Sequence, residues 1–91
     1  MTAKQITELH DLCLQINLLA VNKDNAPIVL YTLIGNSMYP QVGVSVRESG
    51  TSRKIMSFVV FIDEPVDKEY RMNFKKLNDI KKKLKVKKDY C

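Results

Sequence analysis

Residues 41–47, QVGVSVR, alternate strictly between valine and a small or polar residue. Because successive side chains of a strand point to opposite faces, this segment predicts a strand with one apolar and one polar side. Segments rich in β-branched and aromatic residues flank it at 28–34 and 54–62, and the stretches GNSMYP and ESGTS contain turn-forming residues. Short turns between neighbouring strands favour antiparallel pairing. The centre of the chain therefore predicts a three-stranded antiparallel meander.

Residues 3–20 predict an amphipathic helix that precedes the strands. Thr2 and Gln5 have the spacing of a capping box at its start. The apolar residues of this segment recur every three or four positions: Ile6, Leu9, Leu12, Cys13, Ile16, Leu19 and Ala20. Leu14 and Leu18 fall outside this stripe. Either they pack against another part of the molecule, or the helix ends early and residues 14–21 form a fourth strand; we favour the helix.

A second amphipathic helix is predicted at 68–85, with Asp67 as its cap. Its apolar line consists of Tyr70, Phe74, Leu77, Ile80 and Leu84. The element order is then α-β-β-β-α, an α+β fold in which the N- and C-terminal helices pack on a three-stranded antiparallel meander sheet. The length of 91 residues predicts a single domain, 1–91, with a basic C-terminal helix and tail at 68–91.

The net charge of +5 is concentrated near the C-terminus. Residues 75–91 hold eight lysines and two acids, whereas the rest of the chain holds seven bases and eight acids. On a helical wheel, four lysines lie opposite the apolar line and are candidates for electrostatic binding: Lys75, Lys76, Lys82 and Lys83. Lysine without arginine suits contacts with a phosphate backbone better than the reading of bases. The plainer alternative is the solvated side of an amphipathic helix.

The outer strands are apolar on both sides, at 28–34 and 54–62. Helices on one face of a sheet leave the other face open, so these strands predict an exposed apolar patch unless loops or helix ends cover it. Such a patch, or an edge strand, favours a homodimer. Aromatic and methionine side chains are common in the cores of interfaces, and four residues are candidates for apolar contacts with a partner: Tyr31, Met38, Tyr39 and Phe58.

The sequence does not indicate an enzyme. His10 is the only histidine, and Cys13 could meet it on one side of the helix, but a cysteine within an apolar stripe is typical of a buried core residue. The acidic stretch 63–69 is accounted for by a loop and a helix cap. The chain has no phosphate-binding glycine loop. We therefore expect no catalytic residue, no cofactor and no metal.

The N-terminus has no signal-peptide pattern, and no apolar run reaches the roughly 20 residues that a membrane-spanning helix needs. The expectation is a cytoplasmic protein with no membrane association and with reduced thiols. A disulfide between Cys13 and Cys91 remains an alternative.

The α-β-β-β-α order with a basic last helix resembles the double-stranded RNA-binding domain. In that family, lysines at the start of the last helix contact phosphates between two minor grooves, and the matching residues are Lys75 and Lys76. Asp79 stands where the family has a further lysine, and GNSMYP at 35–40 replaces its Gly-Pro-x-His turn. The second helix is also not alanine-rich. The resemblance is one of topology and implies nucleic-acid binding as an alternative function.

Three features together are also similar to short accessory proteins of phages and prophages of Gram-positive bacteria. They are ITELHDLCLQIN at 6–17, the strand pair at 29–48 and the lysine-rich terminal helix. This resemblance brings no catalytic residues. It implies a small non-catalytic protein that binds a host or phage macromolecule, a protein or a nucleic-acid backbone, as an inhibitor or regulator.

Overall fold

The computed structural model describes residues 1–21, 23, 26–35, 38–48 and 53–86. Its elements follow in the order α1 (Ala3–Ala20), β1 (Ile28–Ile34), β2 (Gln41–Arg47), β3 (Lys54–Phe61) and α2 (Lys68–Val86). The predicted α+β fold is confirmed, and each predicted boundary lies within a residue of the observed one. Residues 14–20 belong to α1, so the alternative of a fourth strand is wrong.

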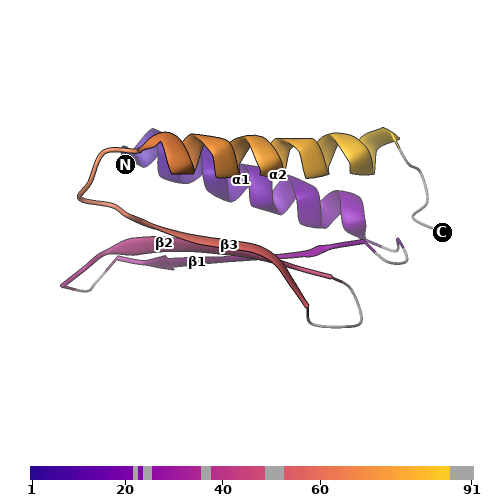
Figure 1. Cartoon of the computed structure of the whole chain (residues 1–91), viewed down its shortest axis with the longest axis horizontal. Helices are drawn as coiled ribbons and strands as arrows, with labels where there is room; N and C mark the ends of the chain where they lie inside the picture. Colours follow the sequence, from indigo (N-terminus) through magenta and orange to yellow (C-terminus); the bar gives the residue numbers. More distant parts are fainter. Residues whose placement is uncertain (22, 24–25, 36–37, 49–52, 87–91) are drawn as a thin grey trace.

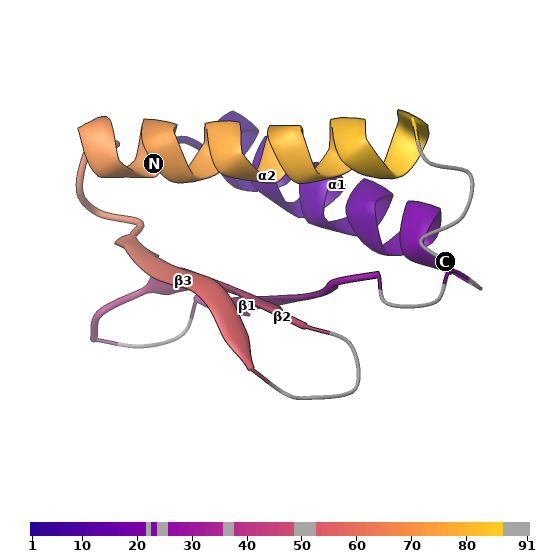
Figure 2. The same cartoon turned by 45° about the vertical axis from the view of Figure 1, so that its right-hand side comes forward.

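The sheet has the order β1-β2-β3, and both pairs of strands are antiparallel. Val44 at the centre of β2 lies opposite Tyr31 on one side and Phe58 on the other. Figures 1 and 2 show two layers, with both helices on the same face of the sheet and running side by side in the same direction. Helix α1 packs on β1 and α2 packs on β3. The opposite face of the sheet is not covered by any described element.

Local signals fix both helix starts. The Thr2 side chain accepts a hydrogen bond from the Gln5 amide at 3.1 Å, and the Gln5 side chain accepts one from the Thr2 amide at 2.8 Å, which completes the predicted capping box. At α2, the Asp67 carboxylate accepts a hydrogen bond from the Tyr70 amide at 2.9 Å. These contacts satisfy backbone donors that a helix start leaves without partners.

The core lies between the helices and the inner face of the sheet. Helices α1 and α2 supply the predicted apolar stripes, and β2 supplies its three valines. The most completely buried side chains are Leu9, Ile16, Leu77, Leu84, Val42, Val44, Val46 and Cys13. The alternation in QVGVSVR therefore sets the phase of the sheet, since its valines all face the helices. Within the described ranges, neither helix is long and apolar enough to cross a bilayer.

Candidate binding surfaces

The basic surface of α2 is the first candidate site. Lys75, Lys76, Lys82 and Lys83 are all exposed, because Leu77 and Leu84 on the other side of the helix are fully buried and fix its rotation. Helix α2 carries eight basic and two acidic side chains. In the described part of the chain, none of these four lysines forms an ion pair with an acidic side chain. The lysines are free to attract an anionic partner.

The open face of the sheet is the second candidate site. The register places alternate residues of β1 and β3 on the side away from the helices, next to Gln41, Gly43, Ser45 and Arg47 of β2. Five of these residues are large, apolar and 40–54% exposed: Ile28, Leu30, Ile34, Val59 and Phe61. We call this set the open face. The sequence predicted that these strands have a second apolar side, but it did not predict which residues lie on it. Those residues are determined by the pairing of β1 and β3 with β2, whose valines face the helices.

Two of the four predicted apolar contact residues belong to the interior. Phe58 is 7% exposed, because it lies opposite Val44 and shares the inner face of the sheet. Tyr31 is half-buried beneath α1, where its ring meets that of His10 edge-on with centroids 5.1 Å apart. Phe58 therefore lies in the core rather than on an exposed surface, and the ring of Tyr31 is engaged within the chain.

The other two predicted contact residues, Met38 and Tyr39, are 84% and 67% exposed on the segment between β1 and β2. Their side chains lie outside the core and at one end of the sheet. Their role in binding stays a prediction.

The described residues that could act as a nucleophile or as metal ligands show no arrangement of that kind. Cys13 is a free thiol that is 1% exposed, and burial raises its pKa to about 11, so it stays protonated at neutral pH. Its predicted burial is confirmed; Cys91 lies outside the described residues. In the described part of the chain, no three His, Cys, Asp or Glu side chains form a group that could hold a metal ion.

A scan against protein-family models and searches of curated proteins and of solved structures match nothing for this chain. The resemblances to phage accessory proteins and to double-stranded RNA-binding domains therefore stay predictions.

Proposed function

We propose that this chain is a non-catalytic binding protein that forms a homodimer through its open face and binds a macromolecular partner with the basic surface of α2. The observation that carries the proposal is the cluster of five exposed apolar side chains on the open face. Several large apolar side chains exposed on one face are a common mark of an interface. The setting that fits best is a cytoplasmic accessory protein, of the kind found in phages, that inhibits or regulates its target.

The dimensions of the open face suit a second copy of the chain. Strands of seven residues at about 3.3 Å per residue, three abreast at about 4.8 Å, present roughly 300 Å² in projection. Side-chain relief raises the accessible area toward the roughly 600 Å² per partner at which stable interfaces begin. The apolar side chains lie on the two outer strands, on either side of the small and polar residues of β2, and this arrangement can match itself across a two-fold axis.

A face-to-face dimer is favoured over pairing of β1 edges. The side-chain amide of Asn17 bonds both the carbonyl and the amide of Val29, so these two groups point away from β2 and are already satisfied. An added strand would have to displace Asn17 at this point. Joining the open faces leaves both helical layers outermost, so a dimer would present two basic surfaces to its partner.

Sedimentation equilibrium across micromolar concentrations tests the assembly, and the expected mass is twice that of the chain. A pull-down from lysate with and without nuclease tests the partner. Retention that survives nuclease supports a protein partner and contradicts the second candidate described next.

The second candidate function is a nucleic-acid-binding module. The observation in its favour is that Lys75, Lys76, Lys82 and Lys83 are exposed without acidic partners among the described residues. Such lysines suit sequence-independent contacts with phosphates. Nuclease-sensitive retention that weakens steeply with salt would support it.

A further inference from the structure

Two leucines of α1 are exposed although its other large apolar residues are buried or half-buried. Leu14 is 47% exposed and Leu18 is 62% exposed. They lie four residues apart, so they stack one turn above the other and form a short apolar ridge. Val21, at the end of the helix, is 59% exposed and extends the ridge. Neither the core nor the open face uses this ridge.

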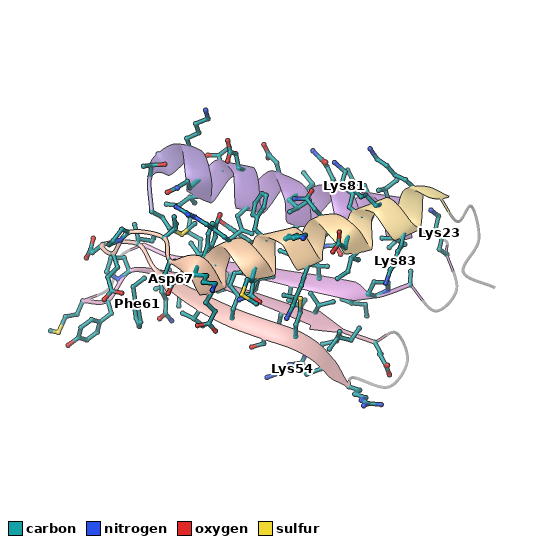
Figure 3. The ribbon with its side chains drawn as sticks, turned by 45° about the horizontal axis from the view of Figure 1, so that its top comes forward. Lys23, Lys54, Phe61, Asp67, Lys81 and Lys83 are labelled. Carbon is teal, nitrogen blue, oxygen red and sulfur yellow. The ribbon has the colours of Figure 1, made fainter. Side chains whose placement is uncertain are left out.

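A groove of about 350 Å³ runs beside the ridge, between α1 and α2. Its walls are formed by Gln15, Leu18, Leu19, Lys81 and Lys85. Leu19 packs partly against the core and supplies an apolar floor. In Figure 3, Lys81 lies on the side of α2 that faces α1, whereas Lys83 lies on the opposite side. The groove therefore has leucines along one wall and lysines along the other.

The lysines of this groove lack acidic partners within the described ranges, although Lys81 is half-buried. A third lysine adds positive charge near this end of α2, since the Lys23 ammonium donates a hydrogen bond to the Leu84 carbonyl at 2.9 Å. The nearest acid on α1 in sequence is Asp11, a full turn before Gln15. Among the described residues, this end of the helical layer thus combines exposed apolar surface with three lysines that form no ion pair.

We propose that this groove docks an acidic amphipathic helix of a partner protein. Leucine-like side chains of that helix would lie along Leu14, Leu18 and Leu19, and its carboxylates would meet Lys81 and Lys85. Laying an apolar helix face into a groove is a common mode of peptide recognition. The proposal names a partner for the basic helix and so rests on the proposed binding function.

Two other anionic partners fit these observations less well. Phosphates of a nucleic acid gain from lysines but gain nothing from exposed leucines and an apolar floor. A bilayer surface is flat on this scale, so it would contact the exposed ridge but would reach the half-buried Leu19 and Lys81 less well. An acidic amphipathic helix suits both the leucines and the lysines of the groove. Its side chains at i, i+4 and i+7 form a narrow apolar row that fits between two helices, and its flanking carboxylates can meet the lysines.

The experiment measures fluorescence anisotropy of a labelled synthetic helical peptide with leucines at i, i+4 and i+7 and glutamates on both flanks. The comparison peptide has lysines in place of the glutamates. The parent chain should bind the acidic peptide and not the basic one. The double variant Lys81→Gln/Lys85→Gln should weaken binding by about tenfold.

The matched control is Lys4→Gln/Lys54→Gln, which removes the same charge from exposed positions outside both the groove and the basic surface of α2 and should weaken binding by less than about threefold, through loss of steering alone. For the apolar wall, Leu18→Ala should weaken binding by about fivefold or more. Its control is Met72→Ala, a similarly exposed residue of α2, which should bind like the parent.

Failure of the acidic peptide to bind at concentrations up to the millimolar range would overturn the proposal. So would equal binding of both peptides, or equal effects of the two double-lysine variants. Anionic phosphatidylserine vesicles that retain the chain when the peptide does not bind would assign the groove to a membrane and contradict the proposal. The variant Val59→Glu, altered only on the open face, should bind the peptide normally even where the dimer is lost, which separates this proposal from the assembly.

Discussion

Asn17 on α1 and Val29 on β1 are joined by two hydrogen bonds, in which the side-chain amide donates to the Val29 carbonyl at 2.8 Å and the side-chain oxygen accepts from the Val29 amide at 3.1 Å. One amide side chain therefore occupies the place of a neighbouring strand at the edge of the sheet. An unprotected edge invites pairing with other chains, and proteins commonly cover such edges. The contact also fixes α1 against β1.

The first prediction concerns this contact. Asn17→Ala should lower the free energy of unfolding by about 1–3 kcal/mol, because both Val29 groups lose their partners. Gln15→Ala removes an exposed amide from the same helix and should change stability by less than about 0.5 kcal/mol. Urea titration measures both values. Equal stabilities of the two variants would show that the Asn17 contact contributes nothing.

The second prediction compares a buried and an exposed member of the predicted apolar contact residues, Phe58 and Met38. Phe58→Ala should lower the free energy of unfolding by about 3–5 kcal/mol, because it leaves a cavity between the sheet and the helices. Met38→Ala should change it by less than about 0.5 kcal/mol, since its side chain is 84% exposed. Thermal or urea unfolding checks both, and a mild effect at Phe58 would contradict its assignment to the core.

The third prediction is a pH dependence that arises from the buried thiol. Burial raises the pKa of Cys13 from 9.0 to about 11, so between these values the unfolded chain loses the thiol proton while the folded chain keeps it. Stability is therefore full below pH 9 and should fall as the pH rises toward 11, by on the order of 2 kcal/mol from this group.

The matched control for that prediction is Cys13→Ala, which removes the thiol contribution. Burial also raises the pKa values of Tyr31 and Tyr70, so the variant should still lose stability at high pH, but less steeply than the parent. Unfolding free energies of both chains at pH 8, 9, 10 and 11 measure the difference. Parallel curves for the two chains would contradict the account of Cys13.

The fold followed from the sequence because its signals were local. The valine alternation at 41–47, the capping box at Thr2 and the apolar stripe of α1 each act over a few residues, and each is present in the structure. Phe58 and Val59 show what such local signals cannot predict. Their segment is apolar on both sides, so only the pairing of Phe58 with Val44 determines which of the two is buried. The exposure of Leu14 and Leu18 could not be predicted from the sequence either, because it depends on which parts of α1 are covered by α2 and β1.

The fourth prediction tests the basic surface of α2. Replacing Lys75, Lys76, Lys82 and Lys83 with glutamine should leave the fold intact, since all four side chains are exposed, with less than about 0.5 kcal/mol of change at each. With a protein partner, association should slow and its salt dependence should diminish, and nuclease should change nothing.

With a nucleic acid, the same variant should flatten the slope of log affinity against log salt by up to about 3–4 units. Surface plasmon resonance at several salt concentrations distinguishes the two cases. A quadruple variant that binds like the parent would show that these lysines are only the solvated side of α2.

The central claim is that the open face joins two copies of the chain, and one comparison by sedimentation equilibrium tests it most directly. Val59→Glu and Met72→Glu place the same charge at residues of nearly equal exposure, 54% and 53%, one on the open face and one on α2. Burial of an unpaired carboxylate between two sheets is strongly unfavourable. The parent and Met72→Glu should sediment as dimers and Val59→Glu as a folded monomer. A parent that is monomeric throughout the micromolar range, or a Val59→Glu variant that remains a dimer, would contradict the claim.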